Sequence, residues 1–135
     1  VRWLAVRQLS RHTDARIRSF AVERISRGST EDGEIELLTN NFEPGDAAFI
    51  LAHLRLPSPR ALLHAILQTV LDVFEKNGED ESMDPMLLAY EHTPCSLCRE
   101  RAVKVLVSRG QAPDWLVQEC RHDASNDIRQ LVSAP

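Results

Sequence analysis

The 135 residues are enough for one domain with a buried core, and their 43% hydrophobic and 27% charged content is ordinary for a globular protein. Aromatic residues make up only 5% of the chain, which favours helices over sheets. No stretch has the unbroken apolar length of a membrane span, and the net charge of −4 disfavours a nucleic-acid-binding protein.

The charge is unevenly distributed along the chain. Residues 1–30 carry seven arginines against Asp14 and Glu23, a net charge of +5, whereas residues 31–94 have a net charge of −10. A basic edge on an acidic body allows an anionic partner at that edge. A structural role is favoured, because arginine forms helices well and its stem covers apolar surface.

The N-terminal part of the chain predicts three short helices. The first is expected over residues 1–11, and the second begins after Asp14, whose carboxylate can cap it, and ends before Gly28. A third helix is expected to begin at a Ser29 or Thr30 cap. Its first turn would carry three acidic residues near the positive end of the helix dipole, Glu31, Asp32 and Glu34.

The middle of the chain predicts one long central helix. A short helix is expected after the turn at residues 43–46, and a longer one begins at Ser58–Pro59 and extends to about Lys76. The longer helix is apolar on two sides, which indicates that it lies between neighbours. Its two apolar stripes are Leu62, Ile66, Val70 and Phe74, and Leu63, Leu67 and Leu71.

The remainder of the chain predicts four more helices after a polar, acidic loop at residues 77–84, which is expected to be solvated. No segment sustains the period-two alternation of a strand. The helices are expected to begin at Asp84–Pro85, at Thr93–Pro94, at Pro113–Asp114, and at Asp123 or Ser125, and Gly110 ends the second of them.

One short phrase occurs three times in the sequence. It consists of an arginine, an alanine–valine pair three residues later, an apolar residue four positions after the alanine, and a closing arginine. Such self-similarity predicts a helical repeat array. The copies cover residues 2–11, 18–27 and 99–109, and a clipped copy covers residues 128–132.

Several segments resemble known helical repeats. Residues 14–21 have an aspartate in the loop, then a β-branched residue, an arginine and an alanine, and this order resembles the second half of HEAT-type repeats. Residues 123–129 resemble another copy, and residues 112–129 also resemble the leucine-rich-variant repeat. The block from Tyr90 to Arg99 is similar to uncharacterised bacterial HEAT-repeat proteins.

This resemblance covers residues 1–28 and 90–133 and implies an all-α fold of short antiparallel helices in a HEAT-like α-solenoid. A compact irregular helical domain is the alternative, because the middle of the chain departs from the pattern. We expect residues 1–135 to form a single α-helical repeat domain. We also expect it to be a fragment of a longer protein, because Val1 already lies within the repeat phrase.

The leading arginine of each copy is expected to be structural. It lies beside the apolar residues of a helix, so its guanidinium can reach a neighbouring loop carbonyl or aspartate through a charge-assisted hydrogen bond. These arginines are Arg2, Arg18, Arg99 and Arg129.

The cysteines are the strongest chemical candidates. Cys95 and Cys98 lie two residues apart at the start of a predicted helix, where the helix dipole favours thiolates. With Cys120 and His122 they could complete a tetrahedral zinc site. Two explanations remain beside it, namely small buried core residues and thiol redox chemistry.

Other candidate residues have structural interpretations. His53 and His64 lie on different predicted helices and could meet across their interface, but a surface or capping role is favoured for each. Trp3 and Trp115 occupy apolar helical positions, which predicts packing in the core.

The sequence contains no glycine-rich phosphate loop, nucleophile elbow or zincin helix, so we expect a non-catalytic protein–protein interaction or scaffold module. It would have no cofactor unless the cysteines bind zinc. Its partner would be another protein or another domain of the same chain; HEAT-like nucleic-acid binding at the basic edge is an alternative. No secretory signal is visible, and a cytoplasmic location is expected. The residues expected to contact the partner are Arg7, Arg11, Arg24 and Arg27.

Overall fold

The computed structural model describes residues 2–30 and 33–133, and all regular structure in these residues is helical, which confirms the all-α prediction. None of the described helices has the length and apolar character needed to cross a lipid bilayer. In chain order the elements are α1 (Arg2–Leu9), α2 (Ala15–Ser26), the 3₁₀ helix η1 (Glu34–Leu38), α3 (Asp46–His53), α4 (Arg60–Lys76), α5 (Asp84–His92), α6 (Ser96–Ser108), α7 (Asp114–Arg121) and α8 (Asn126–Ser133).

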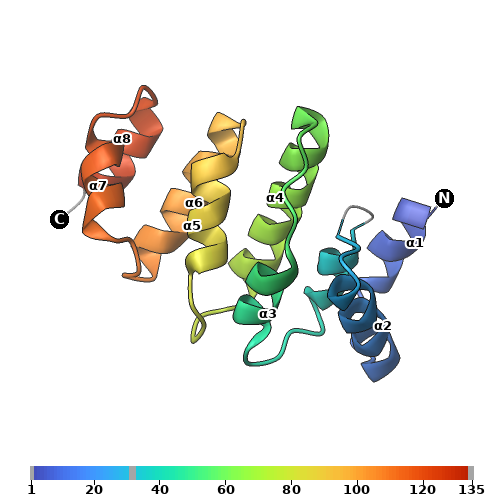
Figure 1. Cartoon of the computed structure of the whole chain (residues 1–135). Coiled ribbons are helices and arrows are strands. Elements are labelled where there is room, and N and C mark those ends of the chain that lie inside the picture. The colour runs from blue at the N-terminus through green and yellow to red at the C-terminus, as the bar shows by residue number, and fades with distance from the viewer. Residues whose placement is uncertain (1, 31–32, 134–135) are drawn as a thin grey trace.

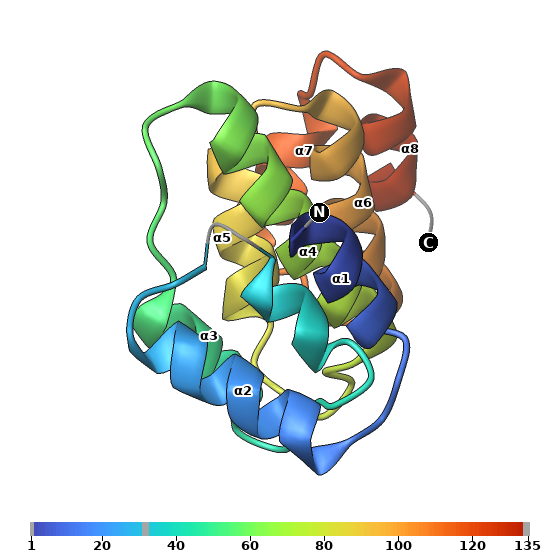
Figure 2. The same ribbon diagram turned by 90° about the vertical axis from the view of Figure 1, so that its right-hand side faces the viewer.

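The helices follow one another from one end of the molecule to the other (Figure 1). α1 and α2 lie at the N-terminal end, α4 lies in the middle, and α7 and α8 lie at the C-terminal end. The main contacts join elements that are close in the sequence, such as α2 with η1, α4 with α5, α5 with α6, and α7 with α8. Figure 2 views the molecule from the N-terminal end, with α1 and α2 towards the viewer.

The start of α2 and the ends of α2 and α6 lie where the sequence predicts them. The Asp14 carboxylate accepts the backbone N–H of Arg16 at 2.8 Å, which caps α2. Gly28 has a φ of +81° after α2, and the next N–H, of Ser29, donates to the Arg24 carbonyl. Gly110 ends α6 in the same way, with a φ of +65°. Both helices thus close with a left-handed glycine, as predicted.

The predicted third helix is a 3₁₀ helix of five residues, and its expected cap is wrong. It begins after Gly33, whose φ is +89°, and no side chain caps it. Gly33 occupies the N-cap position, and the Ser29 hydroxyl instead donates to the Glu34 carboxylate at 2.7 Å. Thr30 is buried, and the predicted acidic residues Glu31 and Asp32 lie outside the described residues.

α4 is the central helix, as predicted. It contacts η1 on one side and α5 and α6 on the other. The Phe74 ring packs edge-on against that of Phe42, with the ring centroids 5.6 Å apart. The predicted Ser58 cap is wrong, because Pro59 occupies the N-cap position. Six α4 side chains are buried, namely Ile66, Leu67, Val70, Leu71, Val73 and Phe74.

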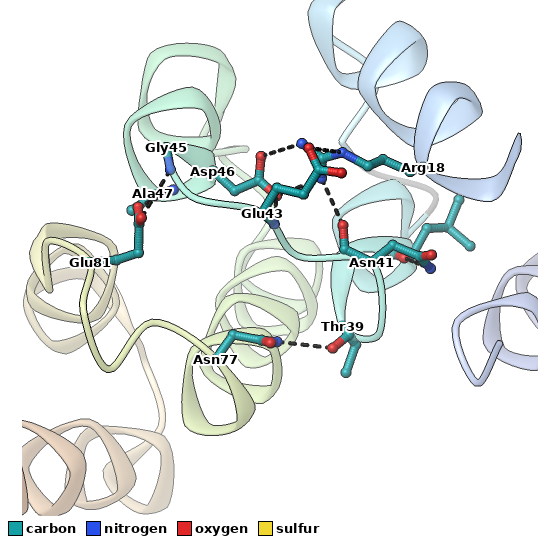
Figure 3. Close-up of polar contacts among 10 residues, drawn as sticks. Arg18, Thr39, Asn41, Glu43, Gly45, Asp46, Ala47, Asn77 and Glu81 are labelled. Carbon is teal, nitrogen blue, oxygen red and sulfur yellow. Dashed lines mark hydrogen bonds and ion pairs between the residues drawn. The ribbon is translucent and has the colours of Figure 1, made fainter. Parts of the chain in front are cut away.

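An ion pair joins α2 to Asp46, the first residue of α3 (Figure 3). The Arg18 guanidinium donates to both carboxylate oxygens of Asp46, at 2.7 and 2.9 Å, and to the Asn41 carbonyl at 2.7 Å. Asp46 is only 5% exposed, and it also accepts the backbone N–H of Glu43 at 2.8 Å. The carboxylate is therefore buried, and both of its oxygens accept hydrogen bonds. A buried ion pair is stable under this condition.

The equivalent arginine of α6 makes the equivalent contact. The Arg99 guanidinium lies 3.0 Å from the carboxylate of Asp123, in the loop between α7 and α8. Arg129 donates to the backbone carbonyls of Asp123 and Ala124 in the same loop. The predicted structural role is confirmed for Arg18, Arg99 and Arg129, whereas the side chain of Arg2 lies outside the described residues.

The acidic loop at residues 77–84 is solvated in part, as predicted, but two of its side chains also contact other segments. The Glu81 carboxylate accepts the backbone N–H groups of Gly45, at 2.9 Å, and Ala47, at 3.4 Å, at the start of α3. The Asn77 side chain donates to the Thr39 carbonyl at 2.9 Å (Figure 3). The loop thus supplies backbone donors of α3 with an anionic acceptor.

Shortening one buried side chain of α4 tests this account of the core. Leu67→Ala should lower the free energy of unfolding by about 2–5 kcal/mol, because it opens a cavity where the leucine is fully buried. Leu97→Ala is the matched control and should change it by less than about 0.5 kcal/mol, because that leucine is 70% exposed. Urea denaturation measures both, and equal losses would contradict a core centred on α4.

Candidate functional site

The first copy of the repeat phrase differs from the others in burial. In the second copy Ala21 and Ile25 are fully buried, and in the third copy Ala102 and Leu106 are fully buried. The corresponding residues of α1 are Ala5 and Leu9, which are exposed. Residues four apart share one face of a helix. The face of α1 that carries Ala5 and Leu9 is therefore exposed to solvent, whereas the corresponding faces of α2 and α6 are buried.

A groove runs between α1 and α2 beside this exposed face. Its volume is about 530 Å³, and its apolar lining comes from Leu9, Ile17, Phe20 and Leu37. Leu9 is 42% and Phe20 is 47% exposed, so large apolar groups face solvent here. We call it the N-terminal groove, and its lining residues are Leu9, His12, Thr13, Asp14, Arg16, Ile17, Phe20 and Leu37.

The four arginines predicted to contact a partner differ in whether they are paired within the chain. Arg24 donates to Ser29 and Glu34 at the start of η1, and Arg27 pairs with Glu23 at 2.7 Å. Arg7 lies over the Trp3 ring, 5.2 Å from its centroid, and is exposed. Arg11 is also exposed, next to the groove. Within the described part of the chain, Arg7 and Arg11 are the two of these four without a carboxylate partner.

The prediction that the tryptophans pack in the core is wrong. Trp3 is 55% exposed and Trp115 is 45% exposed. Their helical positions are apolar, but the core is contacted by Val6 of α1 and by Leu116 and Cys120 of α7. Trp115 packs partly on Tyr90, with ring centroids 6.2 Å apart.

A second candidate site combines one histidine and two cysteines between α4 and α6. The Cys98 sulfur lies 3.3 Å from Nε2 of His64, and these atoms and the Cys95 sulfur all lie within 4.8 Å of one another. We call His64, Cys95 and Cys98 the thiol–imidazole cluster. Arg101 of α6 fixes the two helices together beside it, since its guanidinium reaches Asp72 at 2.6 Å and Glu75 at 2.8 Å on α4.

The predicted four-residue zinc set is brought together only in part. Cys120 is fully buried, and its sulfur lies 3.6 Å from the Tyr90 hydroxyl. His122 is exposed at the end of α7. Neither belongs to the cluster, whose third member is His64. His64 faces Cys98 instead of His53, whose ring nitrogen lies 2.9 Å from the Phe49 carbonyl.

The surroundings of the two cluster thiols differ. The pKa of the Cys95 thiol is lowered from its ordinary value, chiefly because its sulfur accepts the backbone N–H of Cys98, with further help from the Cys98 thiol and the N–H of Leu97. Burial raises the pKa of Cys98, and the adjoining Cys95 raises it further. Burial also raises the pKa of Cys120. Cys95 is therefore the most acidic of the three thiols.

No family model matches the chain, and no curated protein or solved structure is significantly similar to it. The functional inferences below therefore start from the geometry of the N-terminal groove and of the thiol–imidazole cluster.

The thiol environments predict an order of chemical reactivity. In reduced, metal-free protein, iodoacetamide should alkylate Cys95 first and Cys120 last, because the thiolate is the reactive form and Cys120 is fully buried. Since the pKa of Cys95 is lowered, the rate of its alkylation should reach a plateau at a lower pH than the rate for a cysteine in a short peptide. Mass spectrometry of digests over time measures this, and alkylation of Cys120 as fast as Cys95 would contradict it.

Proposed function

We propose that this chain is a non-catalytic helical-repeat interaction module that receives an amphipathic helix at the N-terminal groove. The helix would belong to another protein or to another domain of the same chain. The observation that carries the proposal is the exposure of Ala5 and Leu9, whose counterparts in the other two copies of the phrase are buried.

The chemistry of the groove favours a helix as its occupant. A small residue followed four positions later by a large apolar residue lets a second helix approach closely, and α2 and α6 use this pairing to pack on their own neighbours. An amphipathic helix laid in an apolar groove is a common mode of peptide recognition. Leu9, Ile17 and Phe20 would form the apolar contacts.

The charge beside the groove favours an acidic helix. Arg11 lies in the turn after α1, between the groove residues Leu9 and His12 in the sequence, and has no carboxylate partner among the described residues. Arg7 of α1 lies over Trp3 and lines a different pocket, and Arg18, Arg24 and Arg27 are paired internally. Acidic residues flanking the apolar stripe of the bound helix would complement Arg11 and speed association. The internal pairing also reduces the cationic surface that nucleic-acid binding would need.

The row of helices and the recurrent arginine contacts support a HEAT-like arrangement for this module. In such an array each helical pair buries its apolar face on the next one. On this proposal a partner helix covers the N-terminal groove as a neighbouring repeat would.

Two synthetic helices test this proposal. They share a leucine–alanine stripe, and one carries glutamates and the other lysines beside it. The glutamate peptide should bind more tightly, with NMR shift changes centred on Leu9 and Phe20. Leu9→Gln should weaken its binding about tenfold, since burying a leucine contributes about 1.5–3 kcal/mol.

Leu97→Gln is the matched control for this experiment, because Leu97 is exposed on α6, away from the groove. It should leave the affinity for the glutamate peptide unchanged. Equal binding of the two peptides, or an equal loss of affinity in the Leu97 variant, would contradict the proposal.

A further inference from the structure

We propose that His64, Cys95 and Cys98 bind one zinc ion in a site with three protein ligands and an open fourth position. The proposal is independent of the N-terminal groove, which lies between other helices. It replaces the sequence-based set of Cys95, Cys98, Cys120 and His122 with a cluster formed by α4 and α6.

The separations of the ligand atoms suit a tetrahedral ion. With zinc–sulfur bonds of about 2.3 Å and zinc–nitrogen bonds of about 2.0–2.1 Å, two ligands of a tetrahedral site lie about 3.5–3.8 Å apart. The Cys98 sulfur and the His64 nitrogen are 3.3 Å apart, and all three atoms lie within 4.8 Å of one another. Changes of about 1 Å or less in these separations would therefore accommodate the ion.

The donor set selects the type of metal. Two thiolates and an imidazole are ligands that zinc prefers, whereas magnesium and calcium prefer oxygen ligands. Binding would release the remaining protons of the two thiols, and the resulting two negative charges would balance the ion. The backbone N–H of Cys98 donates to the Cys95 sulfur and would remain its hydrogen-bond partner in the metal site.

The scaffold holds the three ligands in place before any metal arrives. Cys95 occupies the N-cap position of α6 and Cys98 lies in its first turn, so the spacing directs both sulfurs to one side of the helix start. His64 comes from α4, the helix most deeply set in the core. The Arg101 bridges to Asp72 and Glu75 fix the position of α6 along α4.

The fourth position would face an open cleft of about 390 Å³. Its lining includes His64 and Cys95 of the cluster, together with Arg60, Ala61 and Pro94. A zinc ion with three protein ligands holds water or a small ligand in its remaining position. Water is the fourth ligand that we expect, because Cys120 is held against Tyr90 and His122 lies at the end of α7.

Cobalt substitution tests the site directly. Reduced protein freed of metal by a chelator and titrated with Co²⁺ without oxygen should bind one ion per chain. Its spectrum should show thiolate-to-cobalt charge transfer and the intense visible bands of tetrahedral cobalt, and one equivalent of Zn²⁺ should remove them. Zinc should also raise the unfolding temperature of the protein, because it binds only the folded cluster.

Variants separate this cluster from other metal sites. Cys95→Ser and His64→Ala should each weaken cobalt binding at least tenfold, whereas Cys120→Ala and His122→Ala should leave it unchanged. Circular dichroism checks the folding of every variant, and Cys95 and His64 are the preferred targets because neither is fully buried. An octahedral spectrum, binding lost equally in the His122 variant, or conversion of Cys95 and Cys98 to a disulfide in the presence of zinc would overturn the proposal.

Discussion

The ion pair between Arg18 and Asp46 is the interaction on which the N-terminal half of the fold depends. η1 has five residues, too few to be stable as an isolated helix, so its position must come from tertiary contacts. Arg18 reaches past it from α2 and holds the start of α3 through a buried carboxylate and the Asn41 carbonyl. Leu37 of η1 lines the N-terminal groove, so this ion pair also helps to shape the proposed binding surface.

A second ion pair of the same kind involves α6, the helix that carries Cys98 of the thiol–imidazole cluster. Arg99 of α6 reaches the Asp123 carboxylate beyond α7, just as Arg18 reaches Asp46 beyond η1. In each case the arginine reaches across one helix to a carboxylate beyond it. α6 is thereby joined to α7 and α8, and Arg101 joins it to α4. The first turn of α6, which carries Cys98, therefore lies in a firmly supported segment.

Features encoded within one helix or turn could be predicted from the sequence. Gly28, Gly110 and the Asp14 cap act through their own backbone neighbours, and the two-sided apolar pattern of α4 reports its burial directly. The partner of His64 could not be predicted, because Cys98 is 34 positions away and meets it only through the packing of α4 on α6. Periodicity also identifies an apolar face without saying whether a neighbour covers it, which is why the exposure of Trp3 was missed.

A double-mutant cycle on Arg18→Gln and Asp46→Asn tests the central claim most directly, because it isolates the coupling between the two side chains. We predict a stabilising coupling energy of about 1–3 kcal/mol in urea denaturation. A cycle on Arg99 and Asp123 should give the same sign. The exposed pair of Arg27 and Glu23 should give about 0.5 kcal/mol or less. A coupling between Arg18 and Asp46 no larger than that of the exposed pair would contradict the account.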